Sequence, residues 1–217
     1  MSFFFDIFIK YSIKMLEIKK IEKINQKTLN IHRKKTKKTQ IFLFDTKRKF
    51  NNYVSKILYR DNGKYDEIPH FIITKFGEIY QLFDTKYSSS MFDDNKINHR
   101  QIKIALENLG WLNKNLIGNY YVNWLGETFA GEPFIKEWRG YYYWDKYTDQ
   151  QIKSLYELIR MLCEENQIPC KMVPSQGYFG NVINFNGIVC KSNFSDIYNN
   201  INPTFNFNFI KNYEQDE

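Results

Sequence analysis

Hydrophobic residues in this chain occur either as short unbroken runs or at helical spacing. Residues 41–44 are apolar at every position, which is typical of a strand buried on both faces. Apolar residues then recur at Phe50, Val54, Ile57 and Leu58. This spacing predicts a helix over residues 48–59, ended by the turn signal Asp-Asn-Gly at 61–63.

Further strands are predicted between residues 70 and 106. Residues 70–73 and 78–83 are rich in apolar and β-forming side chains and flank the turn sequence Lys-Phe-Gly, which predicts a hairpin. Residues 84–100 are mostly polar, so we expect a long loop there. Alternating apolar residues over 102–106 predict the next strand.

Residues 112–147 form an aromatic-rich insertion in this pattern. Two strands are expected in it, at 120–124 and 141–144, with turns at Gly126 and Gly140. Cross-strand aromatic pairs stabilise such hairpins.

The clearest helix signal follows the insertion. Thr148 is a suitable N-cap, and Gln151, three residues later, predicts a capping box. One apolar stripe continues the helix to about residue 165, where Ile-Pro at 168–169 ends it; the stripe comprises Ile152, Leu155, Ile159 and Leu162. Residues 187–190 predict a last strand, and residues 201–207 lead into a short amphipathic segment.

The order of these elements predicts an α/β fold with a mixed central β-sheet flanked by helices. We expect a basic N-terminal extension at 1–39, one domain at 40–211 that includes the insertion 112–147, and an acidic tail at 212–217. The chain of 217 residues is long enough for one domain with a substantial core.

A net charge of +7 favours anionic partners. The excess is concentrated in the basic run at residues 33–38, for which a solvated linker is a better interpretation than a docking site. No stretch approaches the ~20 apolar residues of a membrane span. Residues 1–14 lack the basic segment and cleavage site of a signal peptide, so we expect a cytoplasmic or phage-associated protein, with Met15 as an alternative start.

Three cysteines without a CxxC pair argue against a disulfide framework. The sequence also lacks a Gly-x-Ser-x-Gly motif and a phosphate-binding loop.

Four blocks of sequence resemble the N-acetylmuramoyl-L-alanine amidases, a family that includes phage amidase-type lysozymes and peptidoglycan recognition proteins. The most specific is HFIITKFGEIYQL at 70–82, which is similar to the family's His-Tyr/Phe…Gly-x-Ile-Tyr-Gln hairpin. The others are residues 40–46, 98–108 and YTDQQ at 147–151, followed by residues 187–193 at the family's spacing. The resemblance covers about residues 40–210 and implies the amidase fold.

The resemblance also implies zinc-dependent hydrolysis of the amide between muramic acid and L-alanine, in which three protein ligands hold the metal. The family's ligand positions fall on Phe44, Lys191 and Asn202. Phe has no ligand atom, a protonated Lys repels a cation, and Asn is a poor zinc ligand. The proton-transfer positions fall on Ala105, Pro69 and Asn200. We therefore expect no metal and no cofactor.

Other residues near these positions are candidates to replace the missing metal ligands and the missing proton-transfer residue. Glu107 shares a strand face with Ala105 and is the candidate catalytic residue. Asp45 and Cys190 are the fallback metal ligands, and zinc is expected only if the site is rearranged around them. His70 and His99 each precede a strand, where a hydrogen-bonded structural histidine is the commoner case. The candidate ligand groove comprises Tyr80, Trp111, Trp124, Trp144 and Asn202, although the tryptophans are more often a hairpin's own core.

Three functions stay open. The favoured one is a catalytically degenerate amidase-like protein that binds peptidoglycan or a muramyl peptide, with phage virion or lysis proteins as further partners. The second is an active zinc amidase with a rearranged metal site. The third is a nucleic-acid or acidic-partner binder that uses the basic run at 33–38, and it is the least favoured because no nucleic-acid-binding fold signature accompanies that run.

Overall fold

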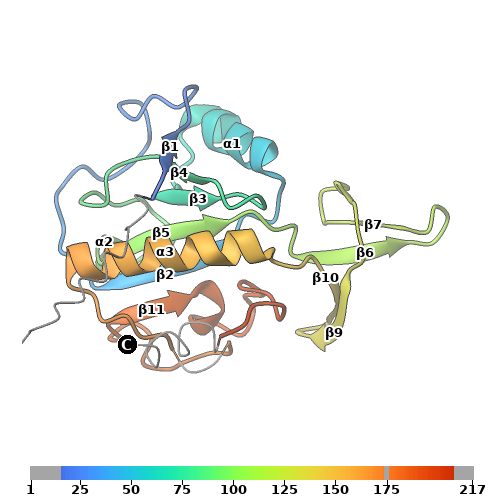
Figure 1. Ribbon diagram of the computed structural model, residues 1–217. Coiled ribbons are helices and arrows are strands. Elements are labelled where there is room, and N and C mark those ends of the chain that lie inside the picture. The colour runs from blue at the N-terminus through green and yellow to red at the C-terminus, as the bar shows by residue number, and fades with distance from the viewer. Residues whose placement is uncertain (1–15, 174–175, 208–217) are drawn as a thin grey trace, which may run out of the picture.

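The computed structural model describes residues 16–173 and 176–207. Its main sheet has six strands in the order β1-β4-β3-β5-β2-β11 (Figure 1). The strands are β1 Ile18–Lys20, β2 Gln40–Asp45, β3 Phe71–Ile73, β4 Ile79–Gln81, β5 Gln101–Leu106 and β11 Gly187–Cys190. Strands β3 and β4 pair antiparallel and the other neighbours pair parallel, which confirms the predicted mixed sheet.

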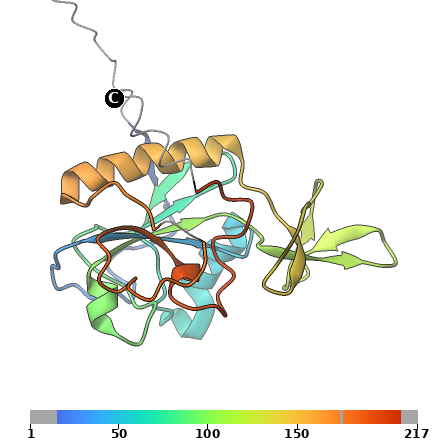
Figure 2. The same cartoon turned by 90° about the horizontal axis from the view of Figure 1, so that it is seen from below.

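Two longer helices cover opposite faces of this sheet: α1, Phe50–Tyr59, and α3, Asp149–Asn166 (Figure 2). Side chains of β2 alternate between them: Ile41 and Leu43 pack in the core beneath α3, while Phe42 and Phe44 pack in the core beneath α1. All six residues of β2 are buried, as expected for a strand covered on both faces. Three short helical segments complete the domain: η1 Arg60–Gly63, α2 Asn95–His99 and η2 Lys191–Asn193.

Helix α2 lies where the sequence predicts only loop. It has five residues, too few to establish a periodic pattern, and its single apolar residue, Ile97, is buried. The Asp94 side chain caps it by accepting from the Lys96 amide at 2.7 Å. The other predicted helices and main-sheet strands are confirmed to within about two residues of their ends.

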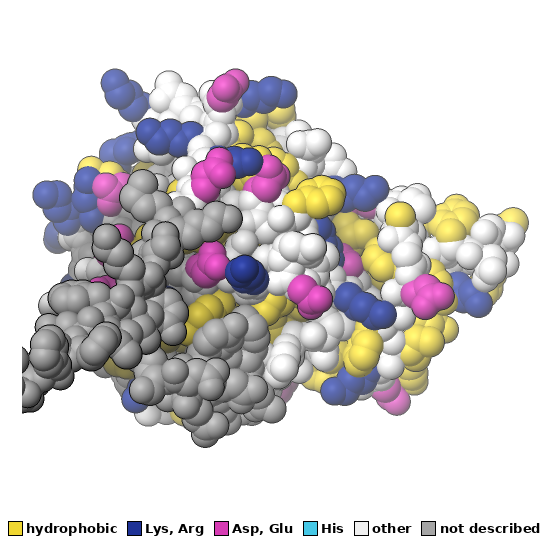
Figure 3. Space-filling view, in the orientation of Figure 1, with side chains coloured by type: hydrophobic (Ala, Val, Ile, Leu, Met, Phe, Trp, Pro, Cys, Tyr) yellow, Lys and Arg dark blue, Asp and Glu magenta, His cyan; other side chains and the backbone are white. Residues whose placement is uncertain are grey.

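The insertion forms a separate sheet of five strands, more than the two predicted. Its order is β8-β7-β6-β10-β9, with β6 Trp111–Asn115, β7 Tyr120–Val122, β8 Thr128–Phe129, β9 Phe134–Trp138 and β10 Tyr141–Trp144. We call residues 111–144 the arm, because they project from the main domain (Figures 1 and 2). Several large apolar side chains are exposed on the arm (Figure 3): Leu116, Ile117, Tyr120, Ile135 and Tyr142.

Asp145, directly after β10, fixes the base of the arm. Its carboxylate accepts from the Leu109 amide at 2.8 Å and from Lys75 Nζ at 2.7 Å. Its carbonyl accepts from the side-chain amides of Asn108 at 3.1 Å and Asn202 at 2.9 Å. These bonds join the arm, the β3–β4 turn and the C-terminal segment at one point.

The described part of the N-terminal extension packs on the domain, because β1 pairs with β4 and Ile24 is buried. Within the basic run at 33–38, Lys38 is buried, unlike a residue of a solvated linker. Its Nζ donates to Thr36 Oγ1, Tyr87 O and His99 O at 2.7–2.9 Å. Burial lowers the pKa of Lys38 to about 7.

Met15 and the acidic tail at 212–217 lie outside the described residues. Within the described part of the chain, no helix has the length and apolar character that crossing a membrane requires.

The predicted capping box at the start of α3 forms only by half. Thr148 Oγ1 accepts from the Gln151 amide at 3.1 Å, as expected for an N-cap. The Gln151 side chain instead donates to the carbonyls of Ile73 at 2.9 Å and Glu107 at 3.0 Å. Gln151 therefore ties the helix to β3 and to the end of β5 rather than closing the box.

We predict that Thr148→Ala lowers the free energy of unfolding by about 1–2 kcal/mol, because an orphan amide of the helix loses its cap. Thr148→Ser keeps the hydroxyl and is the matched control, expected to stay within about 0.5 kcal/mol of the wild type. Urea denaturation measures both. Equal stability of the alanine and serine variants would show that the cap contributes nothing.

Candidate functional site

The register of the main sheet brings positions 44, 105 and 191 together. Phe44 pairs with Ala105 across β2 and β5. Cys190 pairs with Leu43, so Lys191, the next residue, follows beside Phe44. These strands are parallel, so their carboxyl ends meet at one edge of the sheet, where α/β folds commonly bind ligands.

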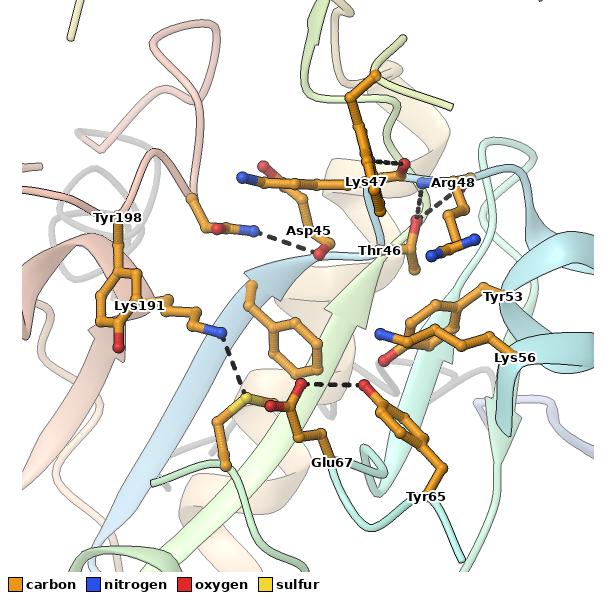
Figure 4. Close-up of a pocket in the computed structure, with 14 residues that line it drawn as sticks. Asp45, Thr46, Lys47, Arg48, Tyr53, Lys56, Tyr65, Glu67, Lys191 and Tyr198 are labelled. Carbon is orange, nitrogen blue, oxygen red and sulfur yellow. Dashed lines mark hydrogen bonds between the residues drawn. The ribbon is translucent and has the colours of Figure 1, made fainter. Parts of the chain in front are cut away.

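A pocket opens at this edge on the α1 side (Figure 4). Four of its side chains are basic, namely Lys47, Arg48, Lys56 and Lys191, and the acidic ones are Asp45 and Glu67. The remaining lining residues are Phe44, Thr46, Tyr53, Tyr65, Met91, Trp124, Tyr198 and Asn200.

Burial perturbs the charged groups of this pocket. It lowers the pKa of Lys56 to about 8, and neighbouring Arg48 lowers it further while Glu67 opposes the shift. Burial also lowers the pKa of Lys47 and of Lys191. It raises the pKa of the Asp45 carboxyl to about 7, so this carboxyl is partly protonated at neutral pH.

The residues at this edge do not fit a zinc ion. Phe44 offers no ligand atom, and Lys191 places a cation beside it. Asn202 does not line the pocket, and its buried amide donates to Asn108 Oδ1 at 3.0 Å and to the Asp145 carbonyl. Among the described residues, no group of three His, Cys, Asp or Glu side chains is placed to hold a metal.

The fallback ligands are held in other contacts. The Tyr147 hydroxyl donates to Asp45 Oδ1, whereas Asp45 Oδ2 is buried without a partner among the described residues. Cys190 is fully buried, and burial raises the pKa of its thiol. A protonated thiol is a poor metal ligand because the thiolate is the ligating form.

The two candidate histidines make structural contacts away from the pocket. His70 is buried, with Nδ1 accepting from the Lys103 amide at 2.9 Å and Nε2 placed 3.0 Å from the Tyr87 carbonyl. Both ring nitrogens are thus used by a neutral imidazole, whose pKa burial lowers well below its usual value. His99 packs edge-on against the ring of His32, with centroids 5.6 Å apart.

Glu107 anchors backbone rather than facing the pocket. Its carboxylate accepts from the amides of Phe50 at 2.8 Å and Lys75 at 2.9 Å. Phe50 is the first residue of α1, and the N-cap residue Lys49 provides no side-chain cap. Glu107 therefore satisfies a free amide at the positive end of that helix, which is a structural role.

The predicted groove residues are not assembled into one surface. Trp144 is fully buried in the arm and donates to the Lys136 carbonyl at 2.8 Å. Trp111 stacks on Tyr141 at 4.5 Å, and Tyr80 packs against Phe50 at 4.8 Å. Asn202, the fifth member of the predicted set, is fully buried. Trp124 is the one member that lines the pocket, where its ring lies 5.1 Å from the Arg48 guanidinium carbon.

The sequence analysis missed the basic lining of the pocket. Lys47 and Arg48 follow β2, Lys56 lies on α1 and Lys191 follows β11, so only the pair at 47–48 is adjacent in sequence. The adjacent pair Lys47 and Arg48, directly after the buried strand β2, was the one local signal in the sequence for this basic lining.

Comparisons of the sequence and of the structure with known proteins point to the same family. The family model described as N-acetylmuramoyl-L-alanine amidase matches residues 25–182. The endolysin amidase LysCS from Clostridium intestinale superposes with a TM-score of 0.52 at 17% identity, covering 92% of this chain and 95% of that one. The E. coli amidase AmiD, solved with a muramyl tripeptide, has a TM-score of 0.51 at 13% identity, covering 82% and 57%. A search of curated protein sequences finds no match.

We predict that Asp45→Asn changes how stability depends on pH. The folded-state pKa of Asp45 is about 7 and its ordinary value is 3.8, so between these values the folded state holds a proton that the unfolded state has lost. The wild type therefore loses stability as pH rises through this window, by at most about 1.4 kcal/mol per pH unit. The asparagine variant lacks this contribution.

Urea denaturation of both proteins between pH 4.5 and 8 measures the difference. The free energy of unfolding of the variant should rise relative to that of the wild type up to about pH 7 and then level off. Parallel pH profiles for the two proteins would contradict a raised pKa at Asp45.

Proposed function

Because the chain belongs to the N-acetylmuramoyl-L-alanine amidase family, whose model matches residues 25–182, we propose that it binds peptidoglycan or a muramyl peptide without hydrolysing it. The observation that carries this proposal is the basic side chain of Lys191 beside Phe44, at the edge of the sheet where the family resemblance places the metal. As further partners we propose phage virion or lysis proteins, which the resemblance of the sequence supports.

Electrostatics supports the loss of zinc chemistry. A zinc ion in this pocket would lie among Lys47, Arg48, Lys56 and Lys191. Partly buried like charges repel more strongly than charges in bulk water, because the surrounding dielectric constant is lower. Phe44 is 4% exposed and packs with Phe42 in the core beneath α1, so its ring cannot move aside without opening that core.

The rearranged zinc site and the nucleic-acid interface are the alternatives. Asp45, Cys190 and Glu107 are the groups on which a rearranged site would depend, and each is engaged or protonated as described above. For the nucleic-acid interface, Lys38 is buried while Arg33, Lys34, Lys35 and Lys37 are exposed. We rank the rearranged zinc site and the nucleic-acid interface below the binding function.

The test uses the full chain purified without chelators. We expect elemental analysis to find zinc well below one equivalent, retention on insoluble peptidoglycan, and no release of peptide from it. The E. coli amidase AmiD provides the positive control for cleavage. One equivalent of zinc together with peptide release would establish the active-amidase alternative, and absence of retention would refute the binding function.

A pair of exposed aromatic residues tests where the glycan or peptide binds. Trp124 lines the pocket and is 47% exposed, whereas Tyr142 does not line it and is 53% exposed. We expect Trp124→Ala to weaken retention about tenfold, as loss of a stacking aromatic does, and Tyr142→Ala to leave it unchanged. Equal retention of the two variants would place binding elsewhere.

A further inference from the structure

The basic residues of the pocket converge without ion-pair partners. Figure 4 shows the charged ends of Arg48 and Lys56 directed into the pocket from one side and that of Lys191 from the other. Within the described part of the chain, none of these three forms a salt bridge. Their side-chain nitrogens are therefore available to an anion.

Aromatic rings and a thioether hold these cations in place. Lys56 Nζ lies 4.3 Å from the centre of the Tyr65 ring, and the Arg48 guanidinium packs on Trp124. Lys191 Nζ lies 5.1 Å from the centre of the Tyr198 ring and 3.5 Å from Met91 Sδ. Ring faces attract a cation but do not neutralise its charge, so the pocket keeps its positive potential.

The acidic side chains of the pocket do not balance this charge. The Glu67 carboxylate accepts from the Tyr65 hydroxyl at 2.9 Å and supplies one negative charge. Four basic side chains line the pocket against two acidic ones, Asp45 and Glu67, so an excess of positive charge remains. A dianion reduces this excess further than a carboxylate does.

Tyr53 gives an independent indication of a ligand. Its side chain is 2% exposed and lines the pocket, yet its hydroxyl has no hydrogen-bond partner among the described residues. A buried hydroxyl without a partner is destabilising, so such groups are rare unless a ligand or water completes their hydrogen bonds. Lys56 Nζ lies 5.7 Å from the centre of the Tyr53 ring, so both residues face the same part of the pocket.

We propose that this pocket binds a phosphate group, either as a phosphate monoester on a sugar or as free phosphate, with Arg48, Lys56, Lys191 and the Tyr53 hydroxyl as its donors. A phosphate monoester carries nearly two negative charges and three terminal acceptor oxygens at neutral pH, which matches several cations and a neutral donor better than a carboxylate does. This inference goes beyond the proposed function, because it concerns a second ligand class and holds whether or not peptidoglycan is retained.

The test is calorimetric titration of the full chain at pH 7.5 and low ionic strength. The probes are inorganic phosphate and N-acetylglucosamine 6-phosphate, with acetate and unphosphorylated N-acetylglucosamine as controls. We expect both phosphates to bind at least about tenfold more tightly than acetate, because charge-assisted hydrogen bonds add with each acceptor. A tighter sugar phosphate identifies the monoester as the ligand, and equal affinities identify phosphate alone.

Variants locate the site. Lys56→Gln and Lys191→Gln should each weaken phosphate binding about tenfold. The matched control is Lys153→Gln on α3, which lies on the opposite face of the sheet, is exposed, and should leave affinity unchanged. Thermal unfolding of each variant checks that it is folded.

Tyr53→Phe separates ligand binding from a structural role. It removes a hydroxyl that has no partner among the described residues, so stability without ligand should be unchanged or higher, while phosphate affinity falls several-fold. The proposal is overturned if phosphate does not bind at millimolar concentration, if acetate binds as tightly, or if all of these variants match Lys153→Gln.

Discussion

The structure depends on the burial of β2 between two strands and two helices. Its backbone pairs with β5 on one side and β11 on the other, and its alternate side chains enter the cores beneath α3 and α1. A strand that is hydrogen-bonded to a neighbour on both edges and covered on both faces is restricted to one register. A shift of one residue would exchange the side chains on its two faces. That register sets Phe44 between Ala105 and Lys191 and so determines what lines the pocket.

Much of the fold follows from local sequence patterns. The unbroken apolar run at 41–44, the turn-flanked hairpin at 70–83 and the helical spacing of the α3 stripe each identify their element. The arm is harder, because its strands are two to five residues long and carry aromatic side chains on both faces. Gly126 and Gly140 still marked its turns correctly, since both have positive φ values, +77° and +79°.

From the sequence, only those neighbours in the candidate site that the register of the sheet places side by side could be predicted. Phe44 lies in β2 and Lys191 directly follows β11, the adjacent parallel strand, so their proximity follows from topology. The roles of Glu107, Asn202 and Trp144 depend on tertiary contacts made with the start of α1, with Asp145 and with the arm's own core. The basic lining is drawn from three elements that lie between residues 47 and 191, and no window of sequence contains it.

The arm leaves and re-enters the domain at neighbouring points. Trp111, in its first strand, pairs with Trp144, in its last, and the Asp145 amide donates to the Gly110 carbonyl at 3.0 Å. The length of the arm between these ends therefore does not set the spacing of the main-sheet residues that flank it. Trp124, at the β7–β8 turn, also reaches back to donate to the Lys47 carbonyl at 3.2 Å and forms one wall of the pocket. A change in the β7–β8 turn would therefore alter one wall of the pocket while the two ends of the arm keep their places at the edge of the main sheet.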